Sequence, residues 1–174
     1  SGIIQAAHRV LGGEMPELEP VSGGDFFFVE EEDAERAARR IVSLVSRSIP
    51  KRLGFDRVRD IQVLSPMHRG SLGARSLNLE LQRELNPASL DGDRVERFGQ
   101  IFAVGDKVMQ VENDYDKDVF NGDVGFIATI DPDTRELAID FDRGRVGYRF
   151  DELDALTLAY ATSVKERGRQ PEPG

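Results

Sequence analysis

The sequence contains no cysteine and only two histidines, and these absences limit the chemistry of the chain. Disulfides, thiolate metal sites and cysteine nucleophiles are excluded, and the distance between His8 and His68 in the sequence argues against a histidine-based metal site. The sequence also lacks a Gly-x-x-x-x-Gly-Lys-Ser/Thr phosphate loop, a Gly-x-Ser-x-Gly elbow and a Ser, His and Asp set suited to nucleophilic catalysis. We therefore expect no catalytic, cofactor-binding or metal-binding residues within the chain.

Long hydrophobic runs are also missing. No apolar run approaches the roughly 20 residues that cross a bilayer, and no charged-then-apolar leader opens the sequence. A soluble, cytoplasmic protein without a membrane partner is the expectation. The chain begins at Ser1 without a methionine, which indicates a fragment excised from a longer protein. Its 174 residues, 39% of them hydrophobic, are enough for one ordinary domain or two small ones with a real core.

The charge is unevenly distributed along the chain. A net charge of −9 argues against a protein that coats nucleic acid, because nonspecific phosphate binding relies on clustered Lys and Arg. Residues 57–83, however, contain five arginines against two acids, whereas residues 97–152 contain seven basic residues against thirteen acidic ones. A local basic site on an acidic body fits a nucleic-acid strand held in a groove.

The first half of the sequence predicts alternating helices and strands. The expected elements are a helix over residues 3–11, a strand over 26–29, a helix that follows an Asp33 N-cap and is closed by Pro50 and Gly54, a strand over 61–64, and a helix over about 71–86 with Leu77, Leu81 and Leu85 on one face. This order predicts a parallel α/β sheet.

In the second half of the sequence, the spacing of the apolar residues changes from a helical period to alternation with polar residues. Residues 88–96 are polar and predict a connector, and apolar residues mostly alternate with polar ones from residue 108 to residue 150, with turn signals between them. This pattern predicts a small antiparallel barrel. Residues 151–164 are again mixed in character and are expected to rejoin the α/β sheet. The expected domains are therefore 1–96 with 153–174, and an inserted barrel over 97–152.

The most informative stretch is Asp60-Ile-Gln-Val-Leu-Ser-Pro-Met-His-Arg-Gly70, a short apolar strand that ends in a polar, basic loop. Open α/β sheets bind ligands at the carboxyl ends of their strands. A hydroxyl, an imidazole, a guanidinium and backbone amides at such an end can hold a phosphate. The alternative is a turn whose arginine is merely solvated.

Two further segments have local explanations. Asn113-Asp-Tyr-Asp-Lys-Asp118 places aspartates two apart, as calcium loops do, but the glycine and the distal glutamate of an EF-hand are not at their required spacings. A solvated hairpin tip is the preferred interpretation. In Phe120-Asn-Gly-Asp-Val-Gly125, Asn-Gly favours a tight turn and Gly125 permits a bulge or a close backbone approach.

Two long runs carry a resemblance to a known family: residues 60–70, and Gly105-Asp-Lys-Val-Met-Gln110 through Phe120-Asn-Gly-Asp-Val-Gly125. They resemble the second motor domain of RecD-like superfamily 1 DNA helicases, which include the alpha subunit of exodeoxyribonuclease V. Residues 1–8, 26–32 and 77–82 also look like parts of that domain. The resemblance implies an α/β fold with a partial RecA-like parallel sheet and an inserted small antiparallel SH3-like β-barrel.

For function, the resemblance implies a C-terminal fragment of an ATP-dependent 5′-to-3′ DNA helicase that serves DNA repair and recombination. The chain would supply part of the single-stranded-DNA track. The full-length parent would use ATP and Mg²⁺, whereas the fragment alone is expected to hold no cofactor and to be inactive. The implied partners are single-stranded DNA, the first motor domain of the same parent, and other exodeoxyribonuclease V subunits.

By matching position, the resemblance also implies a set of DNA-binding residues. They are Ser65, Pro66, His68, Arg69, Asn113, Asn121 and Ser163. The sequence departs from the family after Val164, where Lys165-Glu-Arg-Gly-Arg-Gln-Pro171 replaces a family motif that contacts DNA and nucleotide. A second hypothesis, from a different class, is a non-enzymatic module whose barrel binds a protein partner in a nuclease or helicase complex.

Overall fold

The structure is a computed structural model that describes residues 31–66 and 69–163. The chain divides into two compact units, Ser1–Asp33 and Ala34–Gly174, and the elements below all belong to the second. The helix expected over residues 3–11 and the strand expected over 26–29 lie outside the described residues. The same is true of His68 and of the atypical tail that follows Val164.

The second unit begins with three consecutive helical segments, α2 (Ala34–Ser43), η1 (Leu44–Ser48) and α3 (Ile49–Leu53). They confirm the helix expected after Asp33, although Pro50 does not close it. Pro50 stands in the first turn of α3, where a missing amide hydrogen costs little, and the helix continues to Leu53. Gly54 ends it with a φ of 69°, a left-handed conformation that glycine adopts without steric cost.

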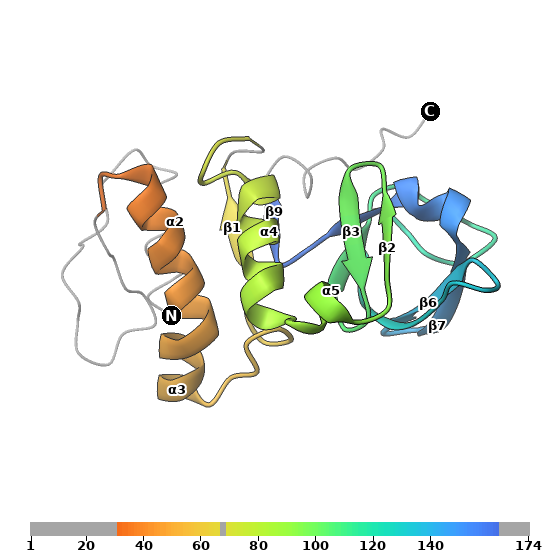
Figure 1. Cartoon of the computed structure of the whole chain (residues 1–174), viewed down its shortest axis with the longest axis horizontal. Coiled ribbons are helices and arrows are strands. Elements are labelled where there is room, and N and C mark those ends of the chain that lie inside the picture. The colour runs from red at the N-terminus through yellow and green to blue at the C-terminus, as the bar shows by residue number, and fades with distance from the viewer. Residues whose placement is uncertain (1–30, 67–68, 164–174) are drawn as a thin grey trace. The chain divides into compact units, whose positions relative to one another are not determined.

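A short parallel pair of strands and one long helix follow. Strand β1 (Val63–Ser65) pairs in parallel with β9 (Ala161–Ser163), and α4 (Ala74–Leu85) connects β1 to the rest of the chain. Helix α4 packs against both α2 and β9 (Figure 1). Its buried apolar stripe is the predicted one, Leu77, Leu81 and Leu85. The α/β character expected from the sequence is therefore confirmed.

The alternating region forms an antiparallel five-stranded sheet, in the order β7-β6-β5-β4-β8. Its strands are β4 (Lys107–Gln110), β5 (Val124–Asp131), β6 (Glu136–Phe141), β7 (Gly144–Arg149) and β8 (Leu156–Leu158). A Cβ on Gly125 would stand 2.6 Å from Cγ2 of Ile139, so this glycine does permit the close approach of β5 to β6. The apolar side of the sheet is filled by Val108, Ile127, Ile130, Leu137, Ile139 and Tyr148.

The predicted connector at residues 88–96 is wrong, because these residues form regular structure. They contain helix α5 (Ala88–Asp91) and most of β2 (Arg94–Arg97), which pairs with β3 (Gln100–Ala103) in a separate hairpin. Only Val95 of β2 is buried, so the strand has no apolar alternation for the sequence to display. The hairpin covers the sheet, since β2 packs against η2 (Phe150–Ala155) and β3 packs against β5.

The return segment at residues 151–164 divides between the two sheets. After η2, β8 pairs with β4 and extends the antiparallel sheet, and only β9 rejoins the parallel pair as expected. Two residues, Ala159 and Tyr160, separate the two strands. The connection between the antiparallel sheet and the parallel pair is therefore very short. Within the described ranges, no helix is long and apolar enough to cross a membrane.

Candidate nucleic-acid interface

Ser65 and Ser163 lie side by side at the carboxyl ends of β1 and β9. The parallel register pairs the two residues directly, so two of the predicted DNA-binding residues meet at one sheet edge. Each is only 2% exposed. The hydroxyl of Ser65 donates a hydrogen bond to the carbonyl of Leu72. Ser65 therefore holds the loop between β1 and α4 in place rather than facing solvent.

That loop presents Arg69 at the start of α4. The amide of Gly73 donates to the carbonyl of Gly70 at 2.9 Å, which folds the loop back on itself. A Cβ on Gly73 would lie 2.6 Å from the carbonyl carbon and oxygen of Arg69, so only glycine fits beneath the Arg69 backbone. The side chains of Pro66 and Arg69 are exposed. The guanidinium is therefore available to an anion near the positive end of the α4 dipole.

Asn113 and Asn121 meet in the hairpin between β4 and β5. The side-chain oxygen of Asn113 accepts a hydrogen bond from the amide of Asn121 at 2.9 Å, and the backbones of Asp114 and Val119 exchange two bonds of 2.8 and 3.1 Å. The predicted hairpin tip is confirmed. It lies on the far side of the five-stranded sheet from β1 and β9 (Figure 1). The structure therefore forms two pairs of predicted residues but does not bring the pairs together.

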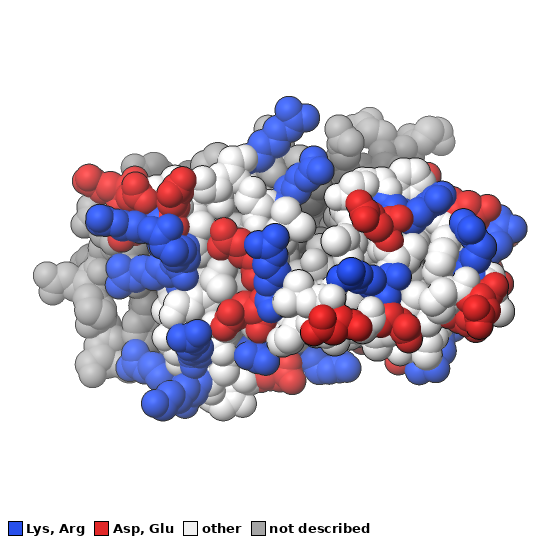
Figure 2. Space-filling model, viewed as in Figure 1, with Lys and Arg blue, Asp and Glu red and all other residues white. Residues whose placement is uncertain are grey.

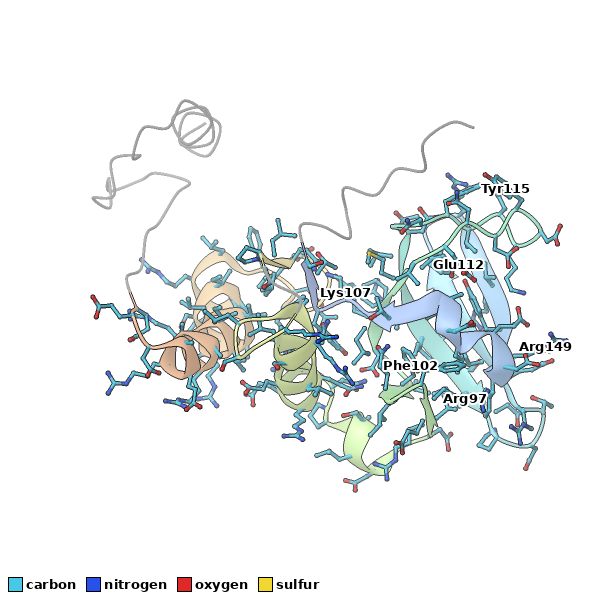
Figure 3. All side chains as sticks on the ribbon, turned by 90° about the horizontal axis from the view of Figure 1, so that it is seen from above. Arg97, Phe102, Lys107, Glu112, Tyr115 and Arg149 are labelled. Carbon is cyan, nitrogen blue, oxygen red and sulfur yellow. The ribbon has the colours of Figure 1, made fainter. Side chains whose placement is uncertain are left out.

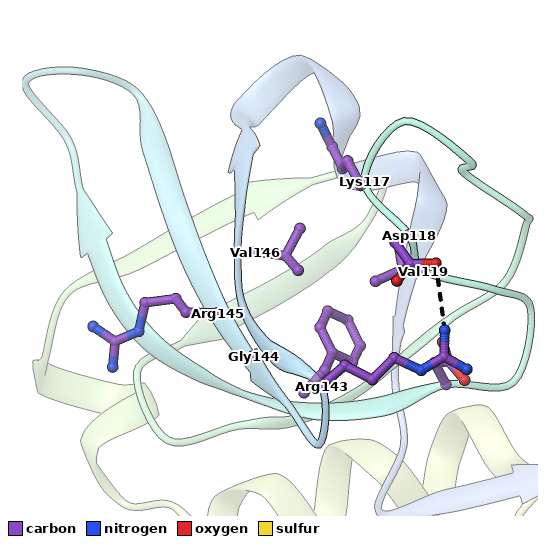
Figure 4. A pocket seen from close by; sticks show the side chains of 9 residues that line it. Lys117, Asp118, Val119, Arg143, Gly144, Arg145 and Val146 are labelled. Carbon is purple, nitrogen blue, oxygen red and sulfur yellow. Dashed lines mark hydrogen bonds and ion pairs between the residues drawn. The ribbon is translucent and has the colours of Figure 1, made fainter.

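A small hollow of about 170 Å³ lies beside this hairpin, and its charges are largely compensated (Figure 4). Arg143 is within 3.4 Å of Asp118, and its guanidinium lies 5.2 Å from the centre of the Phe120 ring. Arg145 points away from the hollow and forms a bidentate pair with Asp140.

Tyr115, 78% exposed, stands at the end of the sheet away from α4 (Figure 3). No group of three or more His, Cys, Asp or Glu in the described ranges is arranged to hold a metal ion.

One ion pair anchors the hairpin to η2 and gives a pH-dependent prediction. The Lys117 ammonium lies 2.7 Å from Glu152, and this hydrogen bond, together with one from the Arg149 amide, holds the pKa of Glu152 below its ordinary 4.5. A lowered pKa stabilises the fold at pH values above 4.5, and this contribution is lost as the pH falls through the folded-state pKa. We expect Glu152→Gln to reduce the free energy of unfolding by about 0.5–1 kcal/mol at neutral pH and by almost nothing in acid.

Denaturant unfolding at neutral and acidic pH measures this difference. The matched control is Asp118→Asn, which breaks the exposed pair with Arg143 and should change stability little at either pH. A Glu152→Gln effect of equal size at both pH values would contradict the ion pair as its cause.

A buried polar cluster around Asp106 was not anticipated from the sequence. Asp106 is fully buried, and its carboxylate accepts four hydrogen bonds: from the amides of Gln82 at 2.7 Å and Asn86 at 2.8 Å, from the backbone of Ala103 at 2.8 Å, and from the Tyr160 hydroxyl at 2.7 Å. Burial raises the pKa of Asp106, while these donors oppose the rise. The cluster ties α4, the turn before β4, and the segment that leads into β9.

Two further buried groups extend this connection. The Lys107 ammonium donates to the carbonyls of Val58 and Ile61, both at 3.1 Å, and Lys107, the first residue of β4, lies at the end of the five-stranded sheet that faces the helices (Figure 3). The Asn78 side chain donates to the carbonyls of Leu158 and Ala161 and accepts from the Ala161 amide, at 2.8 to 3.0 Å. We call Asn78, Gln82, Asn86, Asp106, Lys107 and Tyr160 the polar seam.

The sequence does contain a signal for the seam. Asn78 and Gln82 are four apart on α4 and share one helix face next to the apolar stripe, and Asn86 follows four residues later at the C-cap of the helix. Amide side chains at helical spacing are easily taken for a solvent-exposed face. Here they are the side of the helix that meets the sheet.

Comparisons with known proteins place this arrangement in a family. Residues 77–141 match the family model described as the ATP-dependent RecD-like DNA helicase SH3 domain. The ATP-dependent RecD2 DNA helicase of Deinococcus radiodurans is 36% identical over 163 residues, which cover 93% of this chain. The chain belongs to the RecD-like helicase family. It spans about a fifth (20%) of the length of that relative.

Solved structures of Pif1 from Bacteroides sp. are also similar. The complex with ADP-AlF4 has 13% identity and a TM-score of 0.38, with 76% of this chain and 40% of that chain covered. The unliganded structure has 14% identity and a TM-score of 0.37, with 81% and 42% covered. The matched residues run from within α4 to the end of β6, so they include the β2–β3 hairpin and the strands β4, β5 and β6 of the five-stranded sheet. These matches favour a helicase fragment over the non-enzymatic module considered above.

Proposed function

We propose that this RecD-like chain is part of the second motor lobe of an ATP-dependent 5′-to-3′ DNA helicase, in which it supplies part of the single-stranded-DNA track. One observation carries the proposal. The loop that follows β1 and the end of β9 leave the parallel pair at the same edge, with Ser65 and Ser163 in register and Arg69 exposed between β1 and α4. Ligands of open α/β sheets bind at this edge.

The residues of the track divide the work between contact and support. Arg69, together with Pro66 and His68 of the same sequence run, would contact phosphates, and Ser65 and Ser163 would hold the edge of the parallel pair. Asn113 and Asn121 would hold the β4–β5 hairpin of the SH3 domain near the single-stranded DNA. Phosphate contacts position a strand without reading its sequence, so binding should show little sequence preference.

The chemistry of the parent would be ATP hydrolysis with Mg²⁺ between two lobes. Such catalysis relies on positioning and charge stabilisation by groups from both sides of the nucleotide. The first motor domain of the same parent would supply the phosphate loop, and this chain alone would neither bind ATP tightly nor hydrolyse it. Other exodeoxyribonuclease V subunits are further proposed partners of the parent.

Replacing Arg69 with alanine tests the track. We expect single-stranded-DNA binding by this chain to weaken by roughly 1–3 kcal/mol, and the slope of log affinity against log salt to flatten by about one unit, because one charge-assisted phosphate contact is lost. Fluorescence anisotropy of a labelled oligonucleotide at several salt concentrations measures both quantities.

The matched control is Arg83→Ala, which removes an exposed arginine from the last turn of the same helix. This variant loses the same positive charge as Arg69→Ala, but at a position outside the proposed edge. Its effect on DNA binding should therefore be small. Equal affinities and slopes for the wild type and Arg69→Ala would remove this loop from the track.

A further inference from the structure

The turn of the β2–β3 hairpin holds an exposed phenylalanine in an unfavourable backbone conformation. Arg97 pairs with Gln100, so Phe98 and Gly99 form a two-residue turn, and their φ angles are 53° and 72°. Hairpin turns with two positive φ angles favour Asn or Asp followed by Gly, and a bulky residue at the first position is strained. Phe98 is nevertheless 60% exposed, so it buries little surface in return. Strain without a packing benefit indicates a functional use of the ring.

Two arginines accompany this ring. The Arg97 guanidinium carbon lies 5.2 Å from the centre of the Phe98 ring, and the buried Nε of Arg97 has no hydrogen-bond partner in the described structure. Arg75 reaches the same turn, because one of its terminal nitrogens lies 3.7 Å from the place where a Cβ on Gly99 would stand. An exposed aromatic ring with guanidinium groups nearby is the combination that single-stranded nucleic-acid sites use to stack bases and hold phosphates.

The ring stands over a hollow of about 180 Å³ between α4, the hairpin and β8. Leu79, 42% exposed, lines its apolar side. Its polar side is built by Gln100, whose side-chain oxygen accepts bonds from the Thr157 hydroxyl and the Leu158 amide, both at 3.3 Å. The polar wall is therefore fixed by internal hydrogen bonds, while the side chains of Phe98 and Arg75 are exposed.

The hollow begins at the first turn of α4, a few residues along the chain from Arg69. Arg75 belongs to the first turn of α4, directly after the β1–α4 loop, and it lines the hollow. The start of α4 and the tip of the β2–β3 hairpin point the same way in Figure 1, and blue Lys and Arg side chains stand above this end of α4 in Figure 2. A strand whose phosphate lies at Arg69 would therefore reach Phe98 by passing Arg75.

We propose that Phe98, with Arg97 and Arg75, is a base-stacking site for single-stranded DNA that extends the track from the motor lobe onto the SH3 domain. The inference rests on the proposed function and deepens it, since it assigns the bases, and not only the phosphates, a contact on this chain. The stacking site is sequence-tolerant, because every base offers a π face.

Paired oligonucleotides separate base stacking from phosphate contact. The probes are a fluorescein-labelled 15-mer of thymidylate and a 15-mer of the same length whose central nucleotides are abasic. Loss of base stacking typically weakens binding by roughly 5- to 150-fold, so the wild-type chain should prefer the complete oligonucleotide by a factor in that range. Phe98→Asn, which suits the turn better than phenylalanine, should abolish the preference without lowering the melting temperature.

Phe98→Trp supplies a direct signal, because the chain contains no tryptophan. This variant should keep the preference, and its fluorescence should be quenched by the complete oligonucleotide and not by the abasic one. Arg69→Ala should weaken binding of both probes by the same factor and leave their ratio unchanged.

These variants also distinguish the two proposals. The stacking site would be overturned if Phe98→Asn left the ratio of the affinities for the complete and abasic probes unchanged, or if the wild type bound the two probes equally. The track would still be supported if Arg69→Ala weakened binding. An effect of Phe98→Asn with none of Arg69→Ala would remove the strand-end loop and keep the stacking site. The absence of binding to both probes at low salt would overturn both proposals.

Discussion

Replacing Asp106 with alanine is expected to lower the free energy of unfolding by about 3–5 kcal/mol, the largest loss we expect from a single substitution. The substitution removes the acceptor of four hydrogen bonds at once. The Ala103 amide and the Tyr160 hydroxyl would lose the acceptor described for them, and the amides of Gln82 and Asn86 would each lose one of their two acceptors. Each buried donor left unpaired costs about 1–3 kcal/mol, and relaxation of the site recovers part of the sum.

Chemical denaturation measures this loss, and Asp154→Ala is the matched control. Asp154 is an exposed aspartate of η2, and its replacement should change stability by less than about 0.5 kcal/mol. Asp106→Asn has nearly the same shape but turns one acceptor into a donor that faces donors, so it should also destabilise the chain. If Asp106→Ala unfolded at the same denaturant concentration as the wild type, the seam would not be what holds the five-stranded sheet to α4.

The seam also explains how the SH3 domain and the proposed track are mechanically linked. Strand β8 belongs to the five-stranded sheet and β9 to the parallel pair, and only Ala159 and Tyr160 lie between them. Tyr160 donates to Asp106, while Asn78 holds the backbone on both sides of these two residues. A shift of the sheet would therefore be transmitted to Ser163 rather than absorbed by a flexible connection.

The sequence predicted those parts of the fold that depend on local periodicity. The Leu77, Leu81 and Leu85 stripe of α4 and the alternation of β5 through β7 identify their elements because one face of each is buried. Strand β2 was missed because Val95 is its only buried residue. A half-buried strand is predicted from apolar residues that recur at every second position, and β2 has no second apolar residue two positions from Val95.

The candidate site depends on contacts that periodicity does not encode. The pairing of Ser65 with Ser163 joins residues almost a hundred positions apart, and neither neighbourhood specifies the register by itself. The polar seam was missed for a different reason, because the amide side chains of Asn78 and Gln82 do not belong to the apolar stripe that periodicity detects, although their hydrogen bonds are internal. The unusual residue of the β2–β3 turn is visible in the sequence as Phe98-Gly99, but it gains meaning only once the positive φ angle is known.

Replacing Gly73 with alanine is expected to weaken single-stranded-DNA binding to the level of Arg69→Ala and to cost about 1–3 kcal/mol of stability. The backbone of Gly73, with φ −71° and ψ 150°, suits alanine, so no conformational penalty arises. The added methyl group would instead stand 2.6 to 2.7 Å from three backbone atoms of Arg69. Because backbone atoms cannot rotate away, the loop itself must move, and the Arg69 guanidinium must move with it.

Gly147→Ala is the matched control, since a Cβ there meets no atom within 4 Å and its φ is not positive. This variant should bind DNA like the wild type, and the reduced flexibility of its unfolded chain should raise stability slightly. Both variants add one methyl group to a glycine. Anisotropy titrations and thermal melts of the two therefore compare a displaced β1–α4 loop with an intact one. Because Gly73→Ala retains every charged side chain, weakened binding would show that the position of Arg69, and not only its charge, forms the track. Wild-type affinity in a folded Gly73→Ala variant would contradict that conclusion.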